Sequence, residues 1–309
     1  MSQSTVPFAL YDAFSDRLFG GSQGGVVLNA GDIDAQTRQR IASELGLPAT
    51  CFVSGVTGNT VTARFHSTAR EYPMCGHGTI CLMTHLVHTG LLQWQGKDTL
   101  EVKLILPTKT ARVEVLKQDN KALVMLDIAA PKLEGNQPNL KALAGLLGLK
   151  PADIAGAHPV ATALGDFVHM IVPINCLTAI QSIQPDFTAI TAYCRENGIE
   201  TLTCFSAETI QAGYDFHVRD FCPAVGVPES AAAGTTNAAL ATYWYHHGFL
   251  PKNGVGLNAI KVEQGMELGR PSSIHTTLHS KAGDITRIQV GGVAKKVIEG
   301  HLHLPDETV

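Results

Sequence analysis

The pattern of apolar and polar positions predicts a chain that mixes strands and helices. The stretches TCFV (50–53) and TARFH (62–66) carry the β-branched and aromatic alternation that is typical of strands. In GTICLMTHLVHTG (78–90) apolar residues return every three or four positions and the stretch ends at a glycine, which predicts a helix. DAQTRQRIASELG (34–46) opens with an acidic cap candidate and also ends at a glycine, so we expect another helix there.

The same plan occurs twice along the chain. The first copy comprises ELGLPATCFV (44–53), ARFH (63–66) and CGHGTICLMTHLVHTGLL (75–92), and the second comprises ENGIETLTCFS (196–206), YDFH (214–217) and AGTTNAALATYWYHHGFL (233–250). The TCF triplets of the two copies match, and so do the FH pairs. Gly76 is as far from Gly90 as Gly234 is from Gly248, which indicates two helices of one design and an internal duplication.

Each half is therefore predicted to be a curved sheet that carries a helix opening from a glycine turn. We place the boundary near residue 130, where IAAPKLEGNQPNLKA (128–142) mixes Pro, Gly and Asn. This gives lobes 1–130 and 131–309. The closing segment RIQVGGVAKKVIEGHLHL (287–304) reads as a pair of strands that completes the second lobe.

Composition excludes several classes of protein. Charged residues make up 16% of the chain and the formal net charge is −4, which offers no basic patch for nucleic acid. No apolar run approaches the roughly 20 residues of a membrane-spanning helix, and the first residues lack the pattern of a secretion signal. Seven scattered cysteines without CxxC spacing argue against a disulfide framework. We expect a cytoplasmic protein that binds neither nucleic acid nor a membrane.

The two helix starts are candidate binding positions. Unpaired amides and a partial positive charge of about half a unit mark each helix N-terminus, and Gly76, Gly78 and Gly234 allow close approach to the backbone. If the halves pair about a pseudo-twofold axis, the two turns face each other across a cleft and would hold a small carboxylate. The same field is expected to lower the pKa of the Cys75 thiol, which would make Cys75 a proton carrier.

Three stretches resemble the phenazine-biosynthesis PhzF-like family of the diaminopimelate-epimerase fold. They are EYPMCGHGT (71–79), AGTTNAAL (233–240) and the opening YDAFSDRLFGGSQGGVVLNA (11–30). The resemblance implies an α+β fold of two pseudo-symmetric lobes, each a barrel-like, mostly antiparallel sheet around a central helix. It also implies a cofactor-independent isomerase or epimerase that moves a proton on a small carboxylic acid, usually as a homodimer.

The chain departs from the family pattern at three positions. Ala49 stands where PhzF-like isomerases carry a catalytic glutamate. Ser230 takes the place of the aspartate in the family's second glycine turn, and Ala233 stands where the epimerase branch has its second cysteine. A racemase that uses two thiols is therefore not expected.

The candidate catalytic residues are Cys75, His77 and Glu71. Cys75 could act as acid or base at the helix start, or be a small buried residue that belongs to the turn. His77 could hydrogen-bond the substrate or take a second proton, or simply fill space. Glu71 is the nearest carboxylate and could replace the missing base, or hydrogen-bond the turn structurally.

The candidate substrate-binding residues, besides the three glycines, are Ser22, Ser230, Thr235 and Thr236. The last three could donate hydrogen bonds to a carboxylate while capping the second helix, and Glu229 could take over from the lost aspartate. The helix face of His77, Cys81, His85 and His88 presents too few converging ligands for zinc, so no metal is expected.

Three functions are compatible with these residues. The first is a cofactor-independent isomerase or epimerase in which Cys75 and His77 handle the proton. The second is a PhzF-like protein that binds a small anionic metabolite without catalysis, which Ala49 favours. The third is a lyase that removes water or an amine with a single base.

Overall fold

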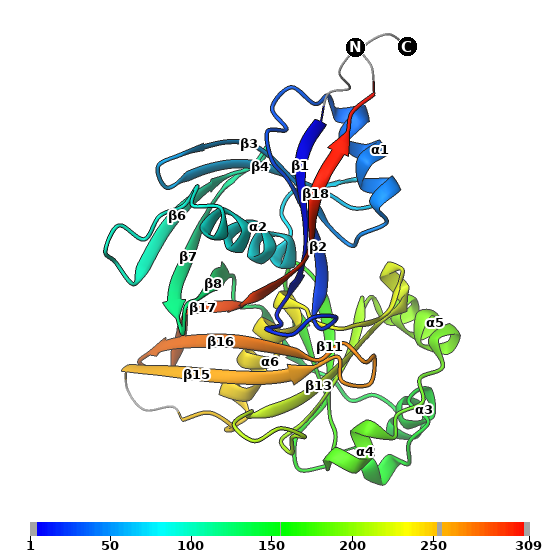
Figure 1. Ribbon diagram of the computed structural model, residues 1–309. Helices are drawn as coiled ribbons and strands as arrows, with labels where there is room; N and C mark the ends of the chain where they lie inside the picture. Colours follow the sequence, from blue (N-terminus) through cyan, green and yellow to red (C-terminus); the bar gives the residue numbers. More distant parts are fainter. Residues whose placement is uncertain (1–4, 155, 252–254, 306–309) are drawn as a thin grey trace. The chain divides into compact units, whose positions relative to one another are not determined.

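The computed structural model describes residues 5–154, 156–251 and 255–305 (Figure 1). The chain divides into two compact units, the first formed by residues 1–126 and 291–309 and the second by residues 127–290. Among the described residues no helix is both long and apolar enough to cross a membrane.

The first unit is a mostly antiparallel sheet with two helices. Its strands are β1 (Thr5–Ala13), β2 (Ser22–Val27), β3 (Thr50–Thr57), β4 (Thr60–His66), β5 (Glu71–Tyr72), β6 (Thr99–Ile105), β7 (Thr110–Gln118), β8 (Lys121–Ile128) and β18 (Ala294–His303). Only the pairs β2–β3 and β4–β6 are parallel among the ladders described for this unit. Helix α2 (Gly76–His88) packs on β1, β2, β3 and β18 and buries most of its length.

Helix α1 (Ala35–Leu45) forms where the sequence predicts it, for the expected local reasons. The Asp34 side chain accepts hydrogen bonds from the amides of Gln36 and Thr37, and Gly46 ends the helix in the left-handed region at φ 65°.

The second unit repeats the sheet-and-helix plan and adds further helices, of which α4 and α5 contact β12. Its strands are β9 (Lys132–Gly135), β10 (Ala161–Leu164), β11 (Val168–Pro173), β12 (Thr201–Ser206), β13 (Phe216–Cys222), β14 (Val227–Ser230), β15 (Val255–Gln264), β16 (Ser272–Lys281) and β17 (Asp284–Gly292). Its helices are α3 (Leu140–Leu146), α4 (Leu177–Gln181), α5 (Phe187–Asn197) and α6 (Gly234–His246), with short 3-10 turns at Pro151–Asp153 and Pro223–Val225. Helix α6 packs on β10, β11 and β16.

Helices α2 and α6 confirm the predicted duplication of the glycine-turn helix. Each has 13 residues and an extended N-cap residue whose side chain makes no capping hydrogen bond. Gly90 and Gly248 follow their ends at φ 73° and 81°, a backbone conformation that favours glycine. The N-cap of α6 is Ala233, so the capping role expected of Thr235 or Thr236 is wrong: these residues lie two and three positions further on, inside the helix.

The predicted assignment of the C-terminal strands needs a correction. Strand β18 pairs antiparallel with β1, from Thr5 opposite His303 to Ala13 opposite Ala294. Residues 291–309 therefore belong to the first unit and do not complete the lobe predicted at 131–309. The break at Leu126 lies close to the predicted boundary at residue 130. The α+β class, with a mostly antiparallel sheet around a central helix in each unit, is confirmed.

Candidate active site

The thiol of Cys75 lies beside the imidazole of His77 at the start of α2. The Cys75 Sγ is 3.4 Å from His77 Nδ1 and 3.7 Å from His77 Nε2. Cys75 is 8% exposed and His77 is half-buried. The two candidate catalytic side chains are therefore in contact at the helix start.

The predicted thiolate is wrong for Cys75. Burial raises the pKa of its thiol from 9.0 to about 11, although the nearby amides of Gly78 and His77 partly oppose the shift. Burial also lowers the pKa of His77 from 6.5 to about 4. Desolvation of the charged forms outweighs the helix field, so near pH 7 the pair consists of a neutral thiol and a neutral imidazole.

Small residues pack tightly under the first turn of α2. A Cβ on Gly78 would lie 3.0 Å from the Phe65 ring and 3.4 Å from the Ala49 methyl. A Cβ on Gly24 would lie 2.7 Å from Cys81 Sγ. Ala49 is fully buried, and its methyl group lies against Gly78 of the glycine turn.

The other candidates of the first unit have identifiable positions. Glu71 on β5 forms a salt bridge with Arg64 at 2.8 Å, and both side chains are partly exposed. The partner is thus Arg64 on β4, whereas the structural alternative predicted a hydrogen bond to the turn. Ser22 opens β2 opposite Ala13 and is half-buried.

Three side chains donate hydrogen bonds to the backbone carbonyl groups of the loop before α6. Gln264 donates to Ser230 O at 2.8 Å, and Ser272 donates to Ala231 O at 2.6 Å. The Asn237 side chain donates to Ala233 O at 2.9 Å. These bonds fix the backbone that presents Ser230 and Gly234.

The two threonines of the second turn differ in their surroundings. Thr236 is buried and its hydroxyl donates to Asp220 Oδ2 at 2.8 Å. Asp220 Oδ1 accepts from the Thr203 hydroxyl, also at 2.8 Å. Thr235 is half-buried and its side chain makes no hydrogen bond within the described part of the chain. Thr235 therefore has the hydroxyl that is available to a ligand.

Glu229 is held in a buried ion pair. It accepts two hydrogen bonds from Arg219, both at 2.9 Å, and both side chains are nearly fully buried. Arg219 also donates to the carbonyls of Ile180 and Ile183. The carboxylate is thus engaged in a bidentate ion pair, as Glu71 is paired with Arg64 in the first unit.

The ladders show which residues of the two units are equivalent. Tyr72 and Ser230 each stand four residues before a helix-opening glycine, and they pair with Phe65 and Asp220 respectively. Phe65 is thus equivalent to Asp220, and the match of the two FH pairs is a coincidence of letters. The FH match drawn from the sequence is wrong.

The next strand follows the same equivalence. Cys51 pairs with Phe65, and Thr203 pairs with Asp220. Cys51 is therefore equivalent to Thr203. The TCF triplets are therefore out of register by one residue, and Ala49 is equivalent to Thr201. Sequence reasoning missed Asp220 for this reason, although one signal was present: an acidic residue inside the apolar strand FHVRDFC.

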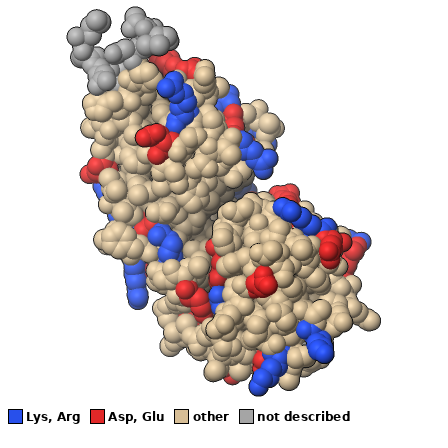
Figure 2. All heavy atoms as spheres, turned by 90° about the vertical axis from the view of Figure 1, so that its right-hand side faces the viewer, with Lys and Arg blue, Asp and Glu red and all other residues tan. Residues whose placement is uncertain are grey.

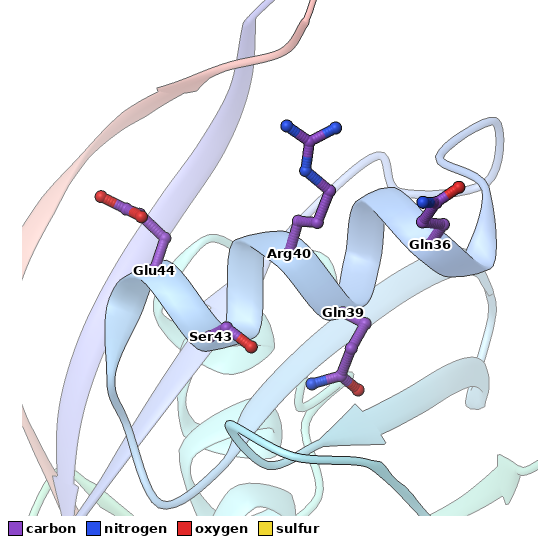
Figure 3. A pocket seen from close by; sticks show the side chains of 5 residues that line it. All are labelled: Gln36, Gln39, Arg40, Ser43 and Glu44. Atoms are coloured by element: carbon purple, nitrogen blue, oxygen red, sulfur yellow. The ribbon is translucent and has the colours of Figure 1, made fainter.

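Other surface features lie apart from these residues. Figure 3 shows a pocket along α1 lined by Gln36, Gln39, Arg40, Ser43 and Glu44, none of which is a predicted site residue. Figure 2 shows acidic and basic residues interspersed on the face in view, without a field of one sign. Within the described ranges no group of three His, Cys, Asp or Glu side chains is arranged to hold a metal ion.

Residues 11–300 match the model of the family described as phenazine biosynthesis-like protein. The chain belongs to this family. An uncharacterized isomerase of Deinococcus radiodurans is 27% identical over 96% of this chain and 95% of its own length. The trans-2,3-dihydro-3-hydroxyanthranilate isomerase of Pseudomonas chlororaphis is 26% identical over 92% of this chain and 95% of its own length.

A solved structure of a phenazine-biosynthesis-like protein shares the fold. The crystal structure of the Bacillus anthracis phenazine biosynthesis protein of the PhzF family has a TM-score of 0.86 to this chain. It is 22% identical, and the match covers 97% of this chain and 100% of the other. The two proteins therefore have the same arrangement of sheets and helices.

Proposed function

We propose that this chain is an isomerase that moves a proton on a small carboxylic acid, with Cys75 and His77 as the proton-handling pair. The observation that carries the proposal is the 3.4 Å contact between Cys75 Sγ and His77 Nδ1 at the start of α2. Membership of the phenazine biosynthesis-like family supports it, as do relatives named as isomerases.

Neutral forms of both groups allow a balanced transfer of protons. The Cys75 S–H bond breaks as a new C–H bond forms on the substrate, while His77 Nε2 takes the proton that leaves another substrate atom. The Nδ1–H of His77 then passes its proton to the Cys75 thiolate. The thiol is restored and the imidazole ends neutral, in its other tautomer. Because the pKa of His77 is about 4, the imidazolium is avoided when these steps are concerted.

Ala49 supports a chemistry that differs from that of the family's glutamate. Its methyl group lies against Gly78 and can neither take nor give a proton. The proposed isomerase therefore relies on the Cys75–His77 pair where the resemblance implies a carboxylate.

Ala49 and the raised pKa of Cys75 also favour a second candidate function. A protein that binds a small anionic metabolite without turning it over would need neither a carboxylate nor a thiolate. The amides at the helix starts and the Thr235 hydroxyl would then serve binding alone.

The experiment uses trans-2,3-dihydro-3-hydroxyanthranilate, the acid in a relative's name, together with a panel of chiral amino and hydroxy acids. Each is incubated with the protein in deuterated water, and NMR follows isomerisation and incorporation of deuterium at carbon. We expect turnover that falls at least about 100-fold in Cys75→Ala, the range of general acid–base catalysis.

The matched control is Cys194→Ala, which makes the same change at a fully buried position of α5 in the second unit. It should keep the activity. Binding in ligand-observed NMR without exchange would support the metabolite-binding function instead.

Two further measurements address other predictions. A Thr235→Val variant tests whether the second helix start binds the same substrate. Light scattering after size exclusion tests the predicted homodimer.

A further inference from the structure

His217 lies between two carboxyl groups in the interior of the second unit. Its Nδ1 is 2.8 Å from Glu263 Oε1, and its Nε2 is 2.9 Å from Glu267 Oε1. The side chains of His217 and Glu263 are fully buried, and that of Glu267 is 15% exposed. Both imidazole nitrogens therefore face carboxyl oxygens inside the protein.

These two contacts require one proton more than a neutral imidazole between two carboxylates would carry. A neutral imidazole has a single N–H, so a second proton must sit on the other nitrogen or on the carboxyl oxygen that faces it. Burial would lower the pKa of His217, but the hydrogen bonds to Glu267 and Glu263 outweigh it and raise the pKa. The second proton thus stays bound below this raised pKa and leaves as the pH rises through it.

The elements packed around His217 add one further charged group. On β12 the residue opposite His217 is Ser206. On β13 the charged side chain two residues along is Arg219, whose Nε is 4.0 Å from Glu267 Oε2. Strand β15 supplies Glu263, and the turn after it supplies Glu267. The second proton is therefore controlled by the two carboxyl groups, with Arg219 beside one of them.

Glu263 and Glu267 differ in how firmly they are held. The two oxygens of Glu263 also accept hydrogen bonds from the amides of Ile210 and Gln211, at 2.6 and 3.0 Å. Glu267 Oε2 is buried and accepts no hydrogen bond from the described residues. When the second proton leaves, one imidazole lone pair faces a carboxyl oxygen with no hydrogen between them. Glu267 is then the group that turns away.

The turn that carries Glu267 also holds the loop before α6. It joins β15 to β16 (Figure 1), and Gln264 and Ser272, on either side of it, donate hydrogen bonds to the carbonyl groups of that loop. Gly265 opens the turn at φ 75°, and a Cβ there would lie only 2.7 Å from Ala231 O. Because the turn and the loop are in close contact, a displacement of the turn would loosen the loop.

We propose that the contact between His217 and Glu267 is a pH-sensitive anchor for the start of α6. While the second proton is bound, the turn at 265–270 is fixed and holds the loop at 230–233 in place. Once the proton is lost, Glu267 turns away, the turn loosens, and Gly234 and Thr235 lose their fixed position. All of these groups belong to the second unit, so the anchor operates within it. Carboxylate binding at this helix start, which rests on the proposed function, would then weaken as the pH rises.

The test needs no substrate. An NMR titration of the His217 ring in the unmodified protein gives the pH at which the proton leaves. Amide hydrogen exchange, followed by mass spectrometry and corrected for the intrinsic chemical rate, is then compared one pH unit below and one above that value. We expect the segments 230–236 and 264–272 to exchange about 10-fold faster at the higher pH. Helix α1 of the first unit should show no such difference.

Glu267→Gln distinguishes the anchor from a merely structural contact. The amide NH₂ of the new side chain can donate to a neutral imidazole, so the turn stays fixed without the second proton. The difference between the two pH values should then fall below about 2-fold, with slow exchange at both. The matched control is Glu134→Gln, the same change in an exposed ion pair with Lys132, which should keep the full difference.

Several results would overturn the anchor. They are a His217 ring that keeps its proton up to the pH of unfolding, equal exchange at the two pH values, and a pH dependence that survives in Glu267→Gln. Faster exchange of 264–272 without 230–236 would overturn the link to α6. None of these readouts uses turnover, so a protein that isomerises no acid would leave the anchor standing, and a failed anchor would leave the test of the isomerase unaffected.

Discussion

The starts of α2 and α6 share a backbone plan and differ in what lies beneath it. Under α2 the contacts are nonpolar and tight, with Gly78 against Phe65 and Ala49. Under α6 the equivalent positions hold hydroxyls and the carboxylate of Asp220. Strand pairing and the position of the helix determine the backbone arrangement in both units. The side chains beneath the helix can be apolar or polar within that same arrangement. The polar interior lies beneath α6, whose N-cap is Ala233. The equivalent N-cap of α2 is Cys75, so the unit with the polar interior is the one that lacks the thiol.

A second contrast lies on the outer face of the same strands. Arg64–Glu71 and Arg219–Glu229 join equivalent positions. The side chains of the first pair are 43% and 32% exposed, and those of the second are 6% and 5% exposed. An exposed ion pair adds little stability, whereas removing one partner of a buried pair leaves an uncompensated charge. The same two residue types thus have very different energetic roles.

The largest effect is expected from breaking the buried pair. Arg219→Met should lower the free energy of unfolding by about 3–5 kcal/mol, because Glu229 would stay buried without its partner. Arg64→Met, the same change at the equivalent position, should cost at most about 1 kcal/mol. Urea unfolding of both variants measures the difference. Equal costs would show that burial does not distinguish the two pairs.

His66 and His217, the histidines of the two FH pairs, should change the stability of the fold with pH in opposite directions. Burial alone would lower the pKa of His217, but hydrogen bonds to Glu267 and Glu263, at 2.9 and 2.8 Å, outweigh it and raise the pKa. Burial lowers the pKa of His66. His217 therefore stabilises the fold fully below about pH 6.5, and this contribution is lost as pH rises through its raised folded pKa.

His217→Gln tests this sign. The variant should lose about 2–3 kcal/mol at pH 6, as expected for hydrogen bonds to charged groups, and less at pH 9. For His66 the folded state resists protonation, so His66→Gln should relieve a loss of stability as pH falls below about 6.5. Thermal unfolding from pH 5 to pH 9 gives both slopes, and parallel slopes for the two variants would contradict the assignment.

Local sequence signals predicted the two helices of the duplication. The pairing of strands that are far apart along the chain could not be predicted from the sequence. Gly90 and Gly248 mark the ends of the two helices through their left-handed backbone conformation, which is a property of a few neighbouring residues. The pairing of β18 with β1 joins the two ends of the chain and has no local signature. The identical TCF and FH residues also gave a wrong alignment of the two halves. Structural equivalence is defined by the register of the strand ladders and not by residue identity.

The chemistry of the site was predicted only in part, for a related reason. The sequence placed Cys75 beside His77 because only Gly76 separates them at the start of one helix. It predicted the wrong charge state, because burial raises the pKa of the Cys75 thiol and the degree of burial is a property of the whole folded unit. Asp220 was missed since only the folded ladder brings it under Thr236.

Adding a methyl group at two glycines of the same turn sharpens the contrast in packing. Gly78→Ala should cost about 1–3 kcal/mol, because its Cβ would lie 3.0 Å from the Phe65 ring in a closed interior. At Gly76 the nearest atom is 3.9 Å from the new Cβ. Gly76→Ala should therefore be neutral or gain up to about 1 kcal/mol from reduced entropy of the unfolded chain. Urea unfolding measures both, and equal costs would mean that the turn tolerates no side chain for another reason.

The smallest effect concerns one buried hydroxyl in each unit. Thr203→Val should lower the free energy of unfolding by about 1 kcal/mol, because it removes the hydrogen bonds of Thr203 to Asp220 and to Thr201. Thr50→Val removes a hydroxyl that has no hydrogen-bond partner among the described residues and should be neutral or slightly stabilising, since an unpaired buried polar group is itself a cost. Because the substitution and the burial are the same, the difference between the two free energies isolates the hydrogen bonds of the second unit. Identical values would indicate that water or another group already satisfies Thr50, and the two interiors would then differ less than their contacts suggest.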